Sequence, residues 1–174
     1  MRALKILNAE KENSFSVVFC GSDKGNLSYV KEQVALMGLE DVVHFLDFVP
    51  IEQLIGLYQN AFALVYPSYF GPNNLPPLEA FALRCSVICA DAPGMKQQLG
   101  DGALYFDPKD PQGIVSKIEE FQQNQSLKNC LIKNGYERAH SWTCKEYLGA
   151  VNSILDEFSS IRSCWSTKET YVHT

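Results

Sequence analysis

Residues 66–81 read YPSYFGPNNLPPLEAF, and this stretch decides the fold of the chain. It starts at the end of an apolar run of strand length, residues 63–66, and continues through a loop rich in Gly, Pro and Asn. A helix is predicted to open near Leu75, because the two prolines that follow are tolerated in a first turn whose N–H groups have no helical partner. Asn74 is a natural N-cap, since its side-chain oxygen can accept one of those N–H groups.

The mouth of this helix is a candidate anion site. The N–H groups of Asn74 and Leu75 would face it, together with the positive end of the helix dipole. Glu79 lies one turn further along, and helical side chains lean back toward the N-terminus. Its carboxylate can therefore sit beside a bound anion and accept hydrogen bonds from sugar hydroxyls. The alternative is that Glu79 only complements the helix dipole, and local chemistry leaves both interpretations open.

Apolar strands alternate with helical segments along the rest of the chain. The strand-length runs are residues 15–20, 42–46, 61–66, 87–90 and 103–106, and helical patterns cover residues 1–10, 27–37, 51–58, 95–99, 111–123, 127–140 and 143–158. Short strands joined by such helices predict right-handed crossovers and a parallel sheet. The fold class is therefore α/β, a Rossmann-like parallel sheet with helices on both faces. The continuous apolar run at residues 15–20 predicts a strand that is covered on both faces.

Three loops are expected to meet at one edge of this sheet, because each leaves the carboxyl end of a strand. Ligands of such folds bind outside these carboxyl ends. They are residues 21–26, 47–50 and 67–74, and this convergence favours the ligand role of Glu79. Residues 21–26 resemble a phosphate loop only loosely. They lack the Gly-Lys-Ser/Thr ending of a P-loop and the three-glycine spacing of a dinucleotide-binding turn. An ordinary strand-to-helix connection is the simpler interpretation.

Composition places the chain among ordinary globular proteins. Its 174 residues suit one domain with a proper core, and 46% of them are hydrophobic. A net charge of −5 without a basic stripe argues against nucleic acid as a partner. No apolar run approaches the ~20 residues of a membrane span, and Lys5 interrupts any apolar core of a signal peptide.

The cysteines and His44 give no sign of a metal site. None of the six cysteines belongs to a Cys-x-x-Cys pair, and no matching histidine pair follows Cys85 and Cys89. We expect free thiols in a reducing compartment. His44 alternates with apolar neighbours and has no acidic partner nearby, which indicates a structural role.

The last helical segment, residues 143–158, carries an apolar stripe that needs a partner surface. Its members are Tyr147, Leu148, Val151, Ile154, Leu155 and Phe158. A stripe this wide is normally buried. It can cap its own sheet, pair with a second chain or stay exposed. We expect it to be the least stably packed helix and the site of self-association. Residues 161–174 form a polar tail beyond a domain of residues 1–160.

The order of these elements resembles the C-terminal, donor-binding half of a GT-B glycosyltransferase of family 4, the glycosyl transferases group 1. The resemblance runs from about residue 4 to residue 158. Three segments carry it: VHFLDFV at residues 43–49 with Glu52, Leu54 and Tyr58 after it, Pro67-Ser68 with LPPLEA at residues 75–80, and GDGALYFDP at residues 100–108. Their combination, in order and at the family's spacing, is specific.

The resemblance implies a role for each residue of the central loops. It makes Glu79 the ribose ligand of a nucleotide-sugar, and it lays the turn of Asp47, Phe48 and Val49 against the nucleobase. The amides of Asn73, Asn74 and Leu75 would meet the diphosphate. Gly71 occupies the position of the family's first glutamate, which is associated with the donor sugar, so asparagine side chains would replace that contact. The predicted substrate-binding residues are Gly21, Asp47, Phe48, Val49, Gly71, Asn73, Asn74, Leu75 and Glu79.

The resemblance also implies partners outside this chain. The family's donor domain begins with a strand and an Arg and Lys pair that contact the diphosphate, and an acceptor domain precedes it. The chain is therefore expected to be a fragment or a truncated product, incomplete at its N-terminus and without catalytic residues of its own.

The implied activity is retaining transfer of a hexose, with mannose as one candidate, from a nucleotide-diphosphate sugar. The acceptor is a glycan or lipid-linked sugar in polysaccharide biosynthesis, and neither a cofactor nor an obligatory metal is expected. The implied location is cytoplasmic, with peripheral contact at the inner face of the membrane through the missing domain. The alternatives are a nucleotide-binding module that acts with a partner domain and a purely structural α/β module.

Overall fold

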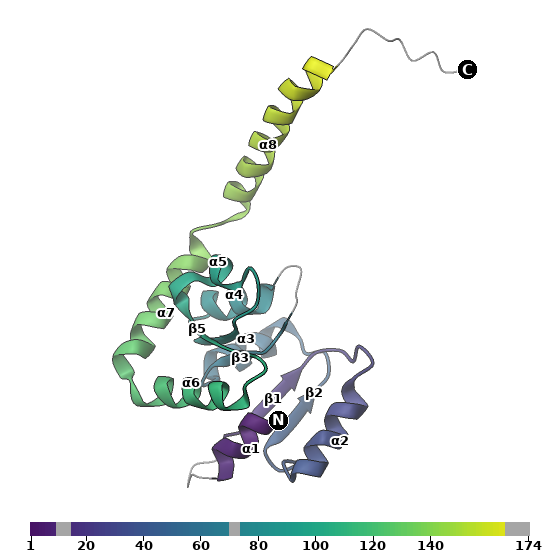
Figure 1. Cartoon of the computed structure of the whole chain (residues 1–174), viewed down its shortest axis with the longest axis vertical. Helices are drawn as coiled ribbons and strands as arrows, with labels where there is room; N and C mark the ends of the chain where they lie inside the picture. The colour runs from purple at the N-terminus through teal and green to yellow at the C-terminus, as the bar shows by residue number, and fades with distance from the viewer. Residues whose placement is uncertain (10–14, 70–73, 166–174) are drawn as a thin grey trace, which may run out of the picture.

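The computed structural model describes residues 1–9, 15–69 and 74–165 (Figure 1). The elements are α1 (Arg2–Ala9), β1 (Val17–Cys20), α2 (Leu27–Met37), β2 (Val43–Leu46), α3 (Ile51–Asn60), β3 (Leu64–Tyr66), α4 (Leu75–Ala82), β4 (Val87–Ala90), α5 (Met95–Leu99), the 3₁₀ helix η1 (Gly100–Gly102), β5 (Ala103–Phe106), α6 (Pro111–Gln123), α7 (Gln125–His140) and α8 (Cys144–Trp165). This order confirms the predicted alternation of strands and helices.

The strands form two parallel sheets. β1 pairs with β2, with Val17 opposite Val43, and β4 lies between β3 and β5, with Val87 opposite both Leu64 and Ala103. The predicted α/β class with parallel strands is therefore confirmed. The single sheet of the prediction is divided in two among the described residues.

This division corrects the prediction for residues 15–20. β1 was expected to be covered on both faces, but Val18 is 45% exposed and Phe19 is 39% exposed. The reason is that β1 pairs only with β2 in the described parts of the chain, so it is an edge strand. β4 has a partner on each side, and all four of its residues are buried. A continuous apolar run becomes a buried strand only where neighbours and helices cover it.

Helices cover both faces of the larger sheet. On one face, Ile88 and Ala90 of β4 pack with residues of α1 and α6, including Phe121. On the other face, Val87 and Cys89 pack with α4 and α5, where Phe81 is the largest buried side chain. Alternate residues of β4 thus point into two apolar clusters, as the pleat of a strand requires.

Helix α1 connects the two sheets. Leu4 packs into a small cluster with Val34, Leu39 and Val43, which belongs to the β1–β2 part. The neighbouring Ala3 and Leu7 pack instead against the larger sheet and α6. The two parts also meet where the rings of Phe15 and Phe62 lie edge to face, with centroids 5.5 Å apart. Different faces of one short helix therefore hold both parts of the molecule.

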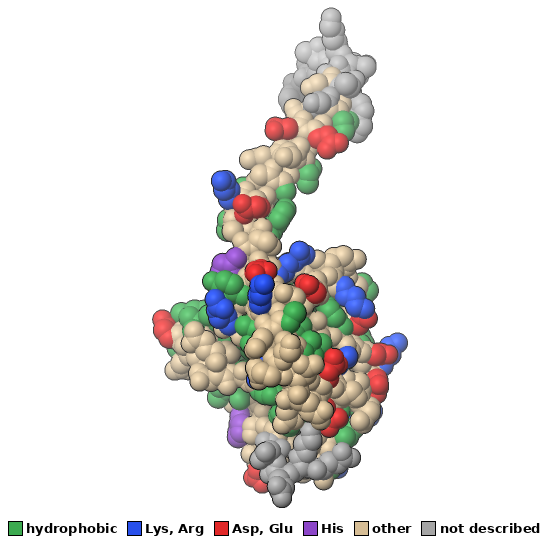
Figure 2. Space-filling view, turned by 90° about the vertical axis from the view of Figure 1, so that its left-hand side faces the viewer, with side chains coloured by type: hydrophobic (Ala, Val, Ile, Leu, Met, Phe, Trp, Pro, Cys, Tyr) green, Lys and Arg blue, Asp and Glu red, His purple; other side chains and the backbone are tan. Residues whose placement is uncertain are grey.

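Helix α8 projects away from the rest of the molecule (Figure 1). Thr143 and Glu146 cap its start, because the Thr143 N–H donates to Glu146 Oε2 at 2.9 Å. Tyr147, Leu148 and Ile154 are all more than half exposed, and Figure 2 shows hydrophobic side chains along this projecting helix. The stripe therefore does not cap its own sheet, and pairing with a second chain stays a prediction. The helix also continues past residue 160, where the polar tail was predicted to begin.

Two further observations concern the whole described chain. Cys20, Cys85, Cys89, Cys130 and Cys144 are free thiols. Among residues 1–9, 15–69 and 74–165, no helix has both the length and the hydropathy to cross a lipid bilayer.

Candidate functional site

The start of α4 has the predicted position but a different cap. Asn74 is the N-cap residue, with a left-handed backbone at φ 43° and ψ 45°, and its side chain accepts no N–H of the helix. The Tyr66 hydroxyl donates to Asn74 Oδ1 over a long 3.4 Å instead, and Gln98 Nε2 donates to the Asn74 carbonyl at 3.3 Å. Two neighbouring elements therefore hold the turn, and the Asn74 side chain leaves the helix mouth uncapped.

Few backbone donors stand at this mouth. Pro76 and Pro77 carry no N–H, so the amides of Asn74 and Leu75 are the first that an anion would meet. Leu75 is exposed and Pro77 is buried. The helix is therefore anchored on one side and open to solvent at its first turn, as an anion site requires.

Glu79 is exposed and lies one turn inside α4. Its Oε2 accepts a hydrogen bond of 3.1 Å from the hydroxyl of Tyr58, which stands near the end of α3. Burial raises the pKa of Tyr58, and the negative charge of Glu79 raises it further. The phenol is therefore protonated and acts as the donor, while the carboxylate keeps capacity to accept other hydrogen bonds.

The loop after β1 is a structural turn rather than a phosphate loop. Asp23 Oδ1 accepts from the backbone N–H groups of Gly25, Asn26 and Leu27, at 2.6, 3.1 and 3.2 Å. These bonds, that of Gly25 foremost, lower the pKa of Asp23. The Gly21 N–H donates to the Leu46 carbonyl at 3.3 Å and so extends the β1–β2 ladder. The amides that would bind a phosphate here already have a carboxylate partner.

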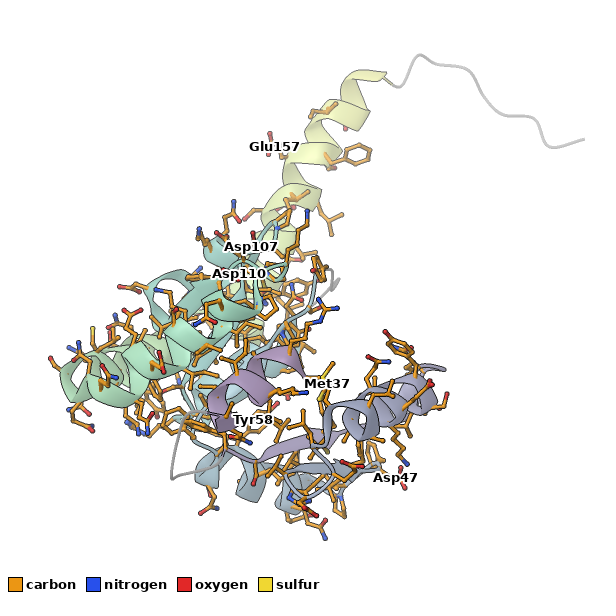
Figure 3. All side chains as sticks on the ribbon, turned by 60° about the horizontal axis from the view of Figure 1, so that its bottom comes forward. Met37, Asp47, Tyr58, Asp107, Asp110 and Glu157 are labelled. Atoms are coloured by element: carbon orange, nitrogen blue, oxygen red, sulfur yellow. The ribbon has the colours of Figure 1, made fainter. Side chains whose placement is uncertain are left out.

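The turn after β2 presents an exposed aromatic ring. Phe48 is 86% exposed, next to the exposed Asp47 and the half-buried Val49. The Cys20 thiol donates to the Asp47 carbonyl at 3.8 Å, which ties this turn to the end of β1. Figure 3 shows Asp47 at the outer rim of the part that holds β2 and α2, whereas Tyr58 lies toward the middle of the molecule.

The structure thus gathers the predicted residues into two groups. Asn74, Leu75 and Glu79 share the first turns of α4. Gly21, Asp47, Phe48 and Val49 share the carboxyl ends of β1 and β2. Gly71 and Asn73 lie outside the described residues.

A cavity that the sequence analysis missed opens at the carboxyl ends of the larger sheet. It has a volume of about 370 Å³ and lies between the residues that follow β3, β4 and β5, among them Tyr69, Asp91 and Asp107. Lys96 Nζ forms an ion pair with Asp91 at 2.5 Å. The signal was present in the sequence, because an aspartate directly follows each of the strands β4 and β5.

Comparison with known proteins gives a consistent group of relatives. Residues 1–138 match the family described as glycosyl transferases group 1. The O-antigen chain mannosyltransferase RfbU of Salmonella typhimurium is 36% identical over 107 residues, which are 62% of this chain and 30% of that protein. The O-antigen chain mannosyltransferase B of Escherichia coli is 26% identical over 143 residues, which are 82% of this chain and 38% of that protein.

A solved structure shares the fold. The Anabaena protein HepE in complex with UDP superposes with a TM-score of 0.71 at 21% identity, over 92% of this chain and 45% of that chain. The chain thus spans less than half the length of each of these three proteins.

Proposed function

Because the chain belongs to the glycosyl transferases group 1 family, we propose that it is the donor-binding part of a hexosyltransferase, with a nucleotide-diphosphate sugar as its ligand. The uncapped N-terminus of α4 carries this proposal, with Glu79 one turn further along the same helix. The helix dipole and the free amides attract the diphosphate. The carboxylate of Glu79, one helical turn away, accepts hydrogen bonds from ribose hydroxyls.

The remaining predicted residues have complementary roles. Asn73, Asn74 and Leu75 donate their amides to the diphosphate. Asparagine side chains replace the donor-sugar contact of the family's first glutamate, whose position Gly71 occupies, as the family resemblance implies. Phe48 offers an exposed ring on which a nucleobase can stack, with Asp47 and Val49 on either side of it in the chain. Gly21 keeps the end of β1 against β2 and so supports that turn.

The proposed donor sugar is a hexose, and mannose is the first candidate because two relatives are named mannosyltransferases. Their names also include the O-antigen chain, which supports a role in polysaccharide biosynthesis. The solved structure of HepE is a complex with UDP, so UDP is the first nucleotide to test and GDP the second. The family resemblance supports retaining transfer without an obligatory metal, a cytoplasmic location, and peripheral membrane contact through an acceptor domain.

The experiment that tests the proposal is a titration of the chain with UDP and GDP, followed by the amide NMR spectrum. We expect shifts at the start of α4 and at residues 47–49, in EDTA as well as in buffer with Mg²⁺. Glu79→Gln should weaken binding by about 1.5–3 kcal/mol, the range for a hydrogen bond to a charged group. Equal titration curves for the two proteins would exclude the ribose-ligand role.

A matched control variant tests whether the loss of binding is specific to Glu79. Glu137→Gln removes an exposed carboxylate from α7 and should leave the nucleotide titration unchanged. If neither nucleotide perturbs the spectrum at millimolar concentration, the chain is a structural α/β module and the proposal is wrong.

A further inference from the structure

The hydroxyl of Tyr58 is the described partner of Glu79 from another element. It donates to Glu79 Oε2 at 3.1 Å across 21 positions of sequence. Tyr58 stands in the last turn of α3 and Glu79 in α4, so the bond joins two helices that lie on either side of β3 in the chain. The acceptor of this hydrogen bond is the carboxylate that we propose as the ligand of the ribose.

The ring of Tyr58 is fixed by apolar packing. It is half-buried and packs against the cluster that contains Ala80, Phe81 and Cys85. An anchored ring holds its hydroxyl at one place, whereas a glutamate that reaches solvent samples several rotamers. The direction of control is therefore from Tyr58 to Glu79.

We propose that Tyr58 is a positioning residue: its hydroxyl holds Glu79 Oε2, so that Oε1 is presented to a ribose hydroxyl of the nucleotide. The inference rests on the proposed function of Glu79. Its physical basis is preorganisation, because a ligand binds more tightly when the side chain it needs is already ordered. One carboxylate oxygen is committed to the protein, and the other stays available to the ligand.

One test measures the orientation of the Glu79 side chain in the absence of any nucleotide. Side-chain scalar couplings in the free chain should report one dominant χ1 rotamer for Glu79. Tyr58→Phe removes only the hydroxyl and should average these couplings. Unchanged couplings in Tyr58→Phe would overturn the positioning role, whatever binds to the site.

The binding test is a double-mutant cycle with UDP. Tyr58→Phe should weaken UDP binding about fivefold, and Glu79→Ala should weaken it at least tenfold. The double variant should match Glu79→Ala alone within twofold, because Tyr58 acts through the carboxylate. Inorganic pyrophosphate, which has no ribose, should bind the chain and Tyr58→Phe equally well.

A control variant separates positioning from general stability. Tyr105→Phe also removes a hydroxyl from a half-buried tyrosine, one that donates to the Gly100 carbonyl at 2.6 Å. It should lower the melting temperature without changing the affinity for UDP.

The outcomes distinguish this inference from the proposed function. If Glu79→Ala binds UDP like the unchanged chain, the ribose role is wrong and the inference falls with it. If Glu79→Ala weakens binding but Tyr58→Phe does not, only the positioning role is overturned. A loss caused by Tyr58→Phe that is equally large without Glu79 also overturns it.

Discussion

Single residues set how closely the helices of this chain approach one another. A Cβ atom placed on Gly135 of α7 would lie 2.5 Å from a ring carbon of Phe81 in α4. One placed on Gly102 would lie 2.8 Å from the Cα of Gly135. The ring of Phe81 is almost wholly buried, so it has little room to move. The contact between α4 and α7 therefore depends on the missing side chains at these two positions.

Gly135→Ala should destabilise the chain. Overpacking of a core costs about 1–3 kcal/mol, and alanine returns at most about 1 kcal/mol of helix propensity. The 2.5 Å approach to a buried ring places the cost in the upper part of that range, so we expect a net loss of about 1–2 kcal/mol in the free energy of unfolding, measured by urea denaturation. Gly149→Ala in α8, where a Cβ meets nothing within 4 Å, is the matched control. Equal midpoints for Gly135→Ala and the unchanged chain would contradict the close contact.

At the scale of elements, the alternation of short strands and helices was predictable because each has a local signal. The Pro pair at the start of α4, Gly38 at the end of α2 and the apolar runs all mark boundaries in the sequence itself. Burial of β1 was not predictable, because it depends on which strand lies beside β1. The same holds for the loop at residues 21–26, where the three hydrogen bonds of Asp23 depend on its exact fold.

The features of the candidate site also divide into those that the sequence predicts and those that depend on the fold. Glu79 and Asn74 were predictable from their spacing in the helix that opens at Leu75. The contact between Tyr58 and Glu79 was not, because it joins two helices across 21 positions. Asn74 shows the limit of a local rule: the residue type predicts the N-cap position, but the left-handed backbone turns its side chain toward Tyr66.

Helix α8 carries the prediction that belongs to this scale. Its exposed apolar stripe favours self-association, because large exposed apolar patches are rare on soluble monomers. Leu155→Glu places a charge in the stripe and should reduce the apparent mass seen by analytical ultracentrifugation toward that of a monomer. Ser153→Glu adds the same charge on the opposite side of the helix and should leave the apparent mass unchanged.

Hydrogen exchange gives an independent reading of the same helix. The amides of α8 should exchange faster than those of β4, which is buried throughout. Protection of α8 equal to that of β4 in a chain shown to be monomeric would rule out the interface.

At the scale of the whole molecule, the proposed donor site would form one side of a binding cleft. The chain spans 30% and 38% of the two curated relatives, and the proposed donor site uses residues from α4 and from the ends of β1 and β2. Proton transfer and acceptor contacts need groups on the opposite side of a reacting sugar. We therefore expect the proposed activity to require groups beyond those of the proposed donor site.

The purified 174 residues should transfer no sugar. Incubation with a radiolabelled nucleotide-sugar and acceptor glycans should give no labelled product above the level of a boiled sample, even where UDP binds. A full-length relative such as RfbU serves as the positive control. Sustained formation of labelled glycan by this chain alone would show that it contains a complete active site.

The bridging position of α1 has a consequence for how the molecule melts. Leu4 stabilises the smaller sheet, and Ala3 and Leu7 stabilise the larger one, so α1 couples the two parts, together with Phe15 and its contact with Phe62. Each part also has an apolar cluster of its own, so we expect the coupling between the parts to be weaker than the packing within them. In a calorimeter the smaller part should therefore give a separate endotherm at lower temperature, and the van't Hoff enthalpy of the main transition should fall short of the total heat absorbed. Heating would thus unfold the part that contains β1 and β2 before the part that contains β3, β4 and β5.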